Sequence, residues 1–239
     1  MRTSLDARGV EGVCVDAKAV AAKRAVQFVE DGMTIGLGSG TTATYAIQFI
    51  GERVRLEGIH VVGVSTSSST NALAEAEGIP LVDITCTGII DLTIDGADEV
   101  DSRLNLIKGG GGALVREKIV AAASRQLVII CDDSKMHSEL GQFPLPVAVV
   151  PFAWHTTRER LLGICPEVTL RKQDNSDAAF VTDDGNLILD LHLASIPEPG
   201  ALEAKISSLI GVVDVGLFVN LATRVIVGFE DGTCREHVR

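Results

Sequence analysis

The chain has few cysteines and few aromatic residues. Its five cysteines are odd in number and widely spaced, and no two of them form the C-x-x-C pair of a zinc site or a redox motif. The five histidines show no spacing typical of metal ligands, so we expect no metal site. Reduced and mostly buried thiols of a cytosolic protein are expected at Cys14, Cys86, Cys131, Cys165 and Cys234.

Long apolar runs and a positive charge balance are also missing. The longest apolar stretches, such as 126–131 and 147–154, are much shorter than the roughly 18 residues of a membrane span. The N-terminus has no apolar h-region of a signal peptide and carries Asp6 and Glu11 early. Lys and Arg number 21 against 32 Asp and Glu, and the net charge of -11 repels phosphate backbones and anionic lipids. We expect a soluble cytoplasmic protein that binds neither nucleic acid nor membranes.

The chain does have apolar sequence for one or two cores, and it has a surplus of glycine. Hydrophobic residues make up 46% and charged residues 22%, close to soluble globular averages, and 24 positions are glycine. Short apolar runs alternate with helical periodicity, which predicts an α/β fold with a Rossmann-like, mostly parallel sheet and helices on both faces. The predicted strands are 33–37, 60–64, 92–94 and 127–131, with a further short apolar run at 80–84, and the predicted helices are 16–28, 43–50, 71–77 and 113–123.

The later part of the chain has a different pattern. Two prolines in Phe143-Pro144-Leu145-Pro146 mark a boundary, and a helix at 156–162 and a strand at 168–171 follow. A hairpin of 178–181 with 186–189 is predicted across Asp183-Asp184-Gly185, before a helix at 201–209 and a strand at 212–215. We predict a small α+β domain at 143–213, inserted late in the chain into a Rossmann-like catalytic domain formed by 1–142 and 214–239, with a strand at 224–227.

The first motif with chemical potential is Gly36-Leu37-Gly38-Ser39-Gly40-Thr41-Thr42, between a predicted strand and a predicted helix. Glycines let the backbone approach a ligand, and a helix N-terminus offers N–H donors to an anion, so the motif predicts a phosphate site. A dinucleotide-binding turn is the rival interpretation. It is disfavoured because Thr41 replaces the third glycine and the later turn Ser65-Thr66-Ser67 has no acid for a ribose. A tight turn without any ligand is the remaining alternative.

Two further motifs carry charged side chains. Asp95-Gly96-Ala97-Asp98 follows a predicted strand, at the sheet edge where α/β proteins bind ligands, although a solvated acidic turn is an alternative. Lys108 precedes four consecutive glycines, which are costly in backbone entropy, and Glu117 comes early in the next helix. Lys108 is therefore a candidate to hold a substrate oxygen. Glu117 is a candidate general base, or simply a first-turn carboxylate favoured by the helix dipole.

Together these motifs resemble the type A ribose-5-phosphate isomerases. The segments GLGSGTT, TIDGADEVD, IKGGGGALVREKI and DDSK stand in the order and at the spacing of that family, with PLPVAVVPFA and VGLF after them. The resemblance spans roughly 18–229. It implies a metal-independent aldose–ketose isomerase without a cofactor, which interconverts D-ribose 5-phosphate and D-ribulose 5-phosphate in the pentose phosphate pathway. It also implies a homodimer or a dimer of dimers.

The resemblance implies a role for individual residues. Glu117 matches the proton acceptor, Lys108 is the cation that stabilises the enediolate, and Asp95 and Asp98 handle hydroxyl protons and ring opening in an order that stays open. A lactonase, an amino-sugar phosphate deaminase and a sugar-phosphate sensor without catalysis are the alternatives. The implied substrate-binding residues are Lys18, Ser39, Gly40, Thr41, Thr42, Asp95, Gly96, Ala97, Asp98, Lys108, Gly109, Gly110, Gly111 and Lys135.

Overall fold

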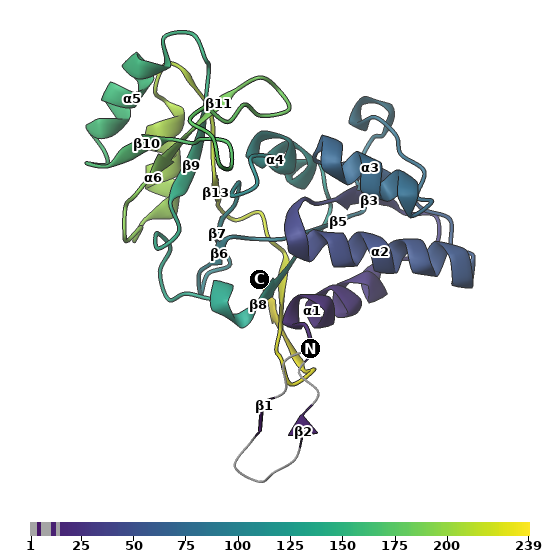
Figure 1. Ribbon diagram of the computed structural model, residues 1–239. Helices are drawn as coiled ribbons and strands as arrows, with labels where there is room; N and C mark the ends of the chain where they lie inside the picture. The colour runs from purple at the N-terminus through teal and green to yellow at the C-terminus, as the bar shows by residue number, and fades with distance from the viewer. Residues whose placement is uncertain (1–3, 6–10, 13–14) are drawn as a thin grey trace.

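The computed structural model describes residues 4–5, 11–12 and 15–239. Its main sheet has six strands (Figure 1): β3 (Thr34–Leu37), β4 (Val62–Ser65), β5 (Leu92–Asp95), β8 (Leu127–Asp132), β14 (Arg224–Gly228) and β15 (Cys234–Val238). Their order across the sheet is β15-β14-β8-β5-β3-β4. All neighbours pair in parallel except β15, which is antiparallel to β14. The predicted mostly parallel sheet is confirmed.

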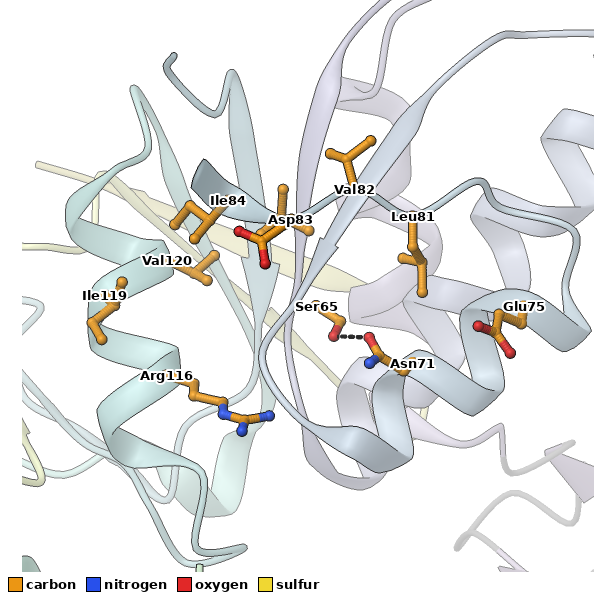
Figure 2. A pocket seen from close by; sticks show the side chains of 11 residues that line it. Ser65, Asn71, Glu75, Leu81, Val82, Asp83, Ile84, Arg116, Ile119 and Val120 are labelled. Atoms are coloured by element: carbon orange, nitrogen blue, oxygen red, sulfur yellow. Dashed lines mark hydrogen bonds between the residues drawn. The ribbon is translucent and has the colours of Figure 1, made fainter. Parts of the chain in front are cut away.

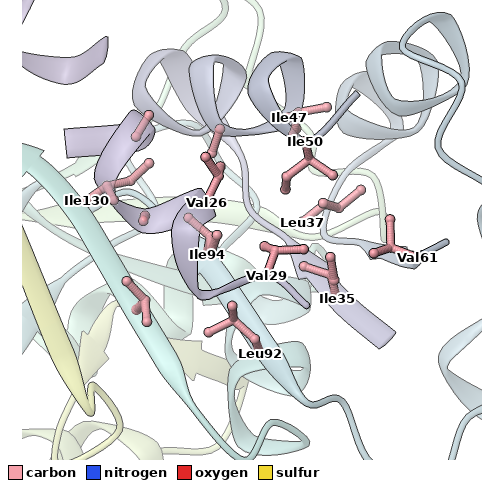
Figure 3. Packing of buried hydrophobic residues seen from close by; sticks show 14 of the residues in the cluster. Val26, Val29, Ile35, Leu37, Ile47, Ile50, Val61, Leu92, Ile94 and Ile130 are labelled. Carbon is pink, nitrogen blue, oxygen red and sulfur yellow. The ribbon is translucent and has the colours of Figure 1, made fainter. Parts of the chain in front are cut away.

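Helices cover both faces of this sheet. The core on one face lies under α1 (Ala17–Ala25), the 3-10 turn η1 (Val26–Phe28), α2 (Gly40–Glu57) and α3 (Ser68–Ala76), and α4 (Leu114–Ala122) packs on the other face. Successive strand residues point to opposite faces. Leu92 and Ile94 of β5 therefore join the first core, which Figure 3 shows, whereas Thr93 bonds Ser124 just after α4. Asp95 shares the face of Thr93, and so it points toward α4.

A second sheet is antiparallel and carries its own core. Its strands are β9 (Leu145–Val149), β10 (Val168–Leu170), β11 (Leu187–Leu191) and β12 (Val212–Val215), in the order β10-β11-β9-β12. The helices α5 (Trp154–Leu162) and α6 (Pro199–Ser207) bury Leu161 and Ile206 against it. Figure 1 shows this unit at one end of the molecule, and α4 contacts β9 and β12. The domain boundaries at 143 and 213 stay predictions.

A small third sheet lies where the two units meet. It consists of β6 (Glu99–Val100), β7 (Leu106–Ile107) and β13 (Leu217–Phe218), in the order β13-β7-β6. The buried Glu99 carboxylate accepts the backbone N–H groups of Gly141 and Phe143, and so it fastens the chain before β9. The remaining short elements are β1 (Ser4–Leu5), β2 (Glu11–Gly12), η2 (Ile84–Cys86) and η3 (Asp133–Lys135).

Some sequence-based expectations differ from the structure. The turn at Asp183-Asp184-Gly185 forms, but the expected hairpin arm 178–181 makes only isolated bridges, and β11 pairs instead with β9 and β10. The cysteines are not mostly buried: Cys131 and Cys165 are buried, Cys86 and Cys234 are exposed, and Cys14 lies outside the described residues. Within the described part of the chain, no helix is long and apolar enough to cross a bilayer.

Candidate active site

The glycine-rich turn after β3 brings the start of α2 against the end of β5. The backbone N–H of Ser39 donates to Asp95 Oδ1 at 3.1 Å, and the Ser39 hydroxyl lies 2.7 Å from the Thr66 hydroxyl. Position 38 has to be glycine, because a Cβ on Gly38 would lie 2.1 Å from Asp95 Oδ1. Among the described residues, the Ser39 side chain makes no capping bond to α2. The first N–H groups of α2 lack an intrahelical acceptor, and they suit an anion.

Lys18 of α1 lies beside this turn. Its Nζ is 3.3 Å from Thr41 Oγ1 at the start of α2. Asp16 caps α1 by accepting the backbone N–H of Lys18, and it also accepts the Tyr45 hydroxyl at 2.7 Å, which ties α1 to α2. Lys135 of η3 faces the same cavity. Two ammonium groups and a helix N-terminus thus form a local anion-attracting region on an acidic protein.

Three buried charged residues meet beneath the turn. Lys108 follows β7, and its Nζ lies 2.9 Å from Asp95 Oδ2 and 3.4 Å from Glu117 Oε1 of α4. The ammonium also donates to the Gly96 carbonyl at 2.7 Å. Burial alone would lower the pKa of Lys108, but the negative charges of Asp95 and Glu117 outweigh it and raise this pKa above its ordinary value. Lys108 is therefore a fixed cation at neutral pH.

Glu117 differs from the other buried side chains of the described chain in having an unsatisfied oxygen. Its Oε2 has no hydrogen-bond partner among the described residues, and the residue is only 5% exposed. Burial raises the pKa of Glu117 to about 8 from an ordinary 4.5, although the Lys108 ammonium acts in the opposite direction. A buried carboxylate oxygen without a hydrogen-bond partner destabilises the fold unless a bound ligand supplies the partner. A carboxylate whose pKa lies near neutral pH is also suited to accept a proton.

The glycine run forms the opposite wall of the site. Gly109 and Gly112 have φ values of +102° and +87°, which other residues rarely adopt. The Gly110 N–H donates to Asp98 Oδ2 at 2.8 Å, and a Cβ on Gly110 would lie 2.5 Å from Asp98 Oδ1. The close approach of backbone to carboxylate therefore requires glycine, and it leaves Asp98 directed at the cavity.

The structure brings almost all of the predicted site residues into one cavity of about 140 Å³. Asp95 is the exception, because it is buried below the wall and is occupied by Ser39, Gly96 and Lys108. The cavity is lined by Lys18, Ser39, Gly40, Thr41, Thr42, Gly96, Ala97, Asp98, Lys108, Gly109, Gly110, Gly111, Glu117 and Lys135. Within the described residues, no group of three His, Cys, Asp or Glu side chains is placed to hold a metal.

A larger hollow of about 520 Å³ lies elsewhere, between α3, α4 and the segment 81–84 (Figure 2). Its walls include Leu81, Ile84 and Ile119, and none of the predicted site residues lines it. Figure 2 shows Arg116 at its rim, but this guanidinium is paired with Asp183 and Asp184. The other charged side chains that line it, Glu75 and Asp83, are acidic, so the larger hollow lacks the lysines that face the smaller one.

Two contacts of the site come from residues that the sequence did not single out. Arg171, after β10, donates to the carbonyls of Gly109 and Gly110. Phe180 lies against Gly112, where a Cβ would come within 2.4 Å of the Phe180 ring. Both residues are more than 55 positions from the glycine run, and no sequence motif connects them with it.

Comparisons with known proteins agree with this geometry. The sequence profile of the family described as Ribose 5-phosphate isomerase A (phosphoriboisomerase A) matches residues 62–232. The chain is 50% identical over 223 residues to Ribose-5-phosphate isomerase A of Cereibacter sphaeroides, covering 90% of this chain and 88% of that protein. It is 45% identical over 216 residues to Ribose-5-phosphate isomerase A 1 of Oceanobacillus iheyensis, with 90% and 95% covered.

Solved structures are similar over almost the whole chain. One is described as D-ribose-5-phosphate isomerase in complex with phospho-erythronic acid; it has a TM-score of 0.90 and 38% identity, covering 93% of this chain and 98% of that one. Another is ribose 5-phosphate isomerase A of Methanocaldococcus jannaschii, with a TM-score of 0.89, 38% identity, and 94% and 99% covered.

Proposed function

The chain belongs to the ribose 5-phosphate isomerase A family and is an aldose–ketose isomerase, and we propose that Glu117 is the base with which it interconverts D-ribose 5-phosphate and D-ribulose 5-phosphate. The observation that carries this proposal is the buried, unpartnered Oε2 of Glu117 beside the Lys108 ammonium. The arrangement offers a proton acceptor and a cation at neighbouring points of one cavity. These are the two groups that proton transfer next to a carbonyl requires.

The reaction follows from moving the carbonyl between C1 and C2. Glu117 takes the proton from C2 of the open-chain aldose, and the electron pair of that C–H bond forms the C1–C2 double bond of an enediolate. The same carboxyl then returns the proton to C1, while a proton moves from the C2 oxygen to the C1 oxygen. Lys108 stabilises the negative charge on these oxygens, which is larger in the transition state than in the substrate. One carboxylate on one face of the substrate thus serves both steps.

The two aspartates differ in what they are able to do. Asp98 lines the cavity and accepts only the Gly110 N–H among the bonds formed by described residues, so an oxygen is available to a substrate hydroxyl. Asp95 is already occupied by two backbone N–H groups and by Lys108. We therefore assign proton transfer at the sugar hydroxyls and ring opening to Asp98, and the placement of the Lys108 ammonium to Asp95.

The phosphate group of the substrate belongs at the start of α2. The backbone N–H groups of Gly40, Thr41 and Thr42 and the ammonium of Lys18 supply donors and positive charge there. Binding of the unreactive phosphate end positions C1 and C2 next to Glu117. The entropy of orientation is then lost on binding, and it no longer adds to the activation barrier.

The test is isomerisation of ribose 5-phosphate with EDTA present, using wild type and Glu117→Gln. Wild type is expected to form the ketose in spite of the chelator. E117Q is expected to bind substrate but to lose on the order of 10³-fold or more in kcat, because the amide accepts no proton. Glu75→Gln is the matched control, since Glu75 is exposed beside the larger hollow, and it should turn over like wild type. Near-normal turnover by E117Q would refute the assignment, and loss of wild-type activity with EDTA would show that a metal takes part.

We also propose that the enzyme is cytoplasmic and works as a homodimer or a dimer of dimers. An exposed apolar group at the end of β9 and the start of β12 supports association of copies: Phe152 is 88% exposed and Ile210 is 80% exposed, next to Val150 and Val213. The Val150 N–H bonds Gly211, so these residues lie together. Light scattering of wild type and of a Phe152→Ser, Ile210→Ser variant tests this. If the double variant had the same molar mass as wild type, this surface would not be part of the interface between copies.

A further inference from the structure

A single arginine of the second sheet holds the glycine run of the active site. Arg171 is largely buried, and its Nη1 donates to the Gly109 carbonyl at 2.7 Å and to the Gly110 carbonyl at 2.9 Å. The rest of its guanidinium forms a two-pronged pair with the Asp190 carboxylate of β11, with Nε 2.9 Å from Oδ2. The planar fork of arginine fits these four contacts at once.

These contacts decide where the loop N–H groups point. In a trans peptide unit the C=O and the following N–H point in opposite directions. The Gly109 carbonyl points to Arg171, and the next N–H, that of Gly110, indeed points to Asp98 Oδ2 at 2.8 Å. The Gly110 carbonyl also points to Arg171, so the N–H of Gly111 points away from it as well. Gly111 lines the cavity, and none of the described residues accepts its N–H.

Apart from Arg171, few interactions order the backbone of the glycine run. Glycine has the largest backbone freedom, and four in succession lose the most entropy when they are ordered. The Gly112 N–H bonds the Gly109 carbonyl, and Arg171 supplies the only side-chain bonds to the carbonyls of Gly109 and Gly110 within the described chain. Removal of the guanidinium would therefore let both peptide planes rotate, and it would also leave the Asp190 carboxylate without its cation, which is why a variant that keeps the charge is needed beside it.

We propose that Arg171, held by Asp190, is a positioning residue for the isomerisation. It acts through the glycine run: it orients Asp98 for the sugar hydroxyls, and it directs the Gly111 N–H at the substrate oxygens. This inference rests on the proposed function. The inference adds a role for the second sheet, which orients the backbone N–H groups of the glycine run through Arg171. No side chain of that sheet needs to contact the substrate.

The experiment compares Arg171→Ala and Arg171→Lys with wild type in steady-state kinetics with ribose 5-phosphate. We expect R171A to lose about 10- to 100-fold in kcat, while KM changes by less than about threefold, because the phosphate end at α2 is untouched. R171K is expected to remain close to R171A, because an ammonium keeps the charge but cannot form the four planar contacts. Tens of millimolar guanidinium should restore part of the R171A rate, and methylammonium should not.

Arg158→Ala is the matched control. Arg158 also belongs to the second unit and also bonds a backbone carbonyl, that of Val168 at 2.9 Å, but within the described chain no hydrogen bond joins it to the glycine run. R158A should keep the wild-type kcat and should not respond to guanidinium. A wild-type kcat in R171K, or equal kcat losses in R171A and R158A, would overturn the inference, and R171K decides alone if R171A does not fold. An inactive wild type would instead refute the proposed function.

Discussion

Replacing Glu117 by glutamine should change how stability depends on pH. The carboxyl is 5% exposed, and its pKa is raised by burial to about 8 in the folded enzyme, against 4.5 for the ordinary group. Between these values the folded state keeps a proton that the unfolded chain has released. The contribution of Glu117 to the free energy of unfolding is therefore greatest below about pH 4.5. It falls steadily as the pH rises toward 8.

The size of the effect follows from the slope of this linkage. One proton corresponds to about 1.4 kcal/mol per pH unit, so the wild type should lose roughly 3 kcal/mol relative to E117Q between about pH 6 and pH 8. The glutamine side chain of E117Q has nearly the shape of the protonated acid and does not titrate, and all other groups are common to both proteins. The difference between the two curves therefore isolates Glu117.

Urea denaturation of both proteins at several pH values across this range measures the free energy of unfolding. The two proteins should be close in stability at about pH 4.5, E117Q should already be the more stable one near pH 6 by roughly 2 kcal/mol, and its advantage should grow further up to pH 8. If the free energies of unfolding of the two proteins changed with pH in the same way, the reasoning would be refuted. Such a result would mean that Glu117 is already ionised in the folded enzyme over this pH range, because Lys108 offsets its burial completely.

Three other substitutions probe the remaining parts of the site. Lys108→Met should lower kcat by about 10²- to 10³-fold and change KM much less, because we propose that its charge stabilises the enediolate; steady-state kinetics in which only KM rises would contradict this. Lys18→Met should raise KM several-fold with a smaller change in kcat, and it should weaken the salt dependence of KM, since Lys18 lies at the start of α2, where we propose that the phosphate binds. Gly38→Ala should lower the melting temperature by several degrees, because its Cβ would lie 2.6 Å from a backbone Cα of β5, whereas Gly88→Ala, with nothing within 4 Å, should not.

Much of the main sheet was predictable because its elements carry local signals. The runs 33–37, 92–94 and 127–131 all correspond to strands, since apolar runs between turns identify buried parallel strands. The helix predicted at 43–50 is longer, Gly40–Glu57. Its first turn consists of glycine and threonines at the ligand site, and its last turns are polar and carry the Arg53–Glu57 ion pair. The first turn lacks the apolar periodicity that the prediction used, and in the last turns only Val54 continues it against the core.

The predicted hairpin forms only beside its turn, where Val181 bridges Leu187, and its pairing stops there for a tertiary reason. Its turn forms, but Asp183 accepts the Ser68 N–H at the start of α3 and pairs with Arg116 of α4. Phe180, in the expected first arm, turns to cover Gly112. Contacts with distant parts of the chain therefore replace the ladder that local turn chemistry predicted.

The residues that line the cavity carry sequence motifs that predict their grouping, but the different placement of the two aspartates has no such signal. Asp95 and Asp98 are three positions apart, and only the structure places one below the wall and the other on the cavity. The antiparallel pairing of β13 with β7 also has no signal in the local sequence. It lets the Lys108 N–H bond the Gly216 carbonyl, so that the backbone of Lys108 is held by a segment more than a hundred residues away.

The position of β14 has a consequence for synthesis of the protein. This strand lies between β8 and β15, and α1 packs on β14 as well as on β8. Until residues 224–238 have left the ribosome, one edge of β8 has no neighbour and α1 is only partly covered, although almost everything else is present. A chain that ends a few residues early would expose an apolar strand edge, which chaperones and proteases recognise. The pairing of β14 and β15 is thus the step that closes the sheet beside β8 and completes the cover of α1.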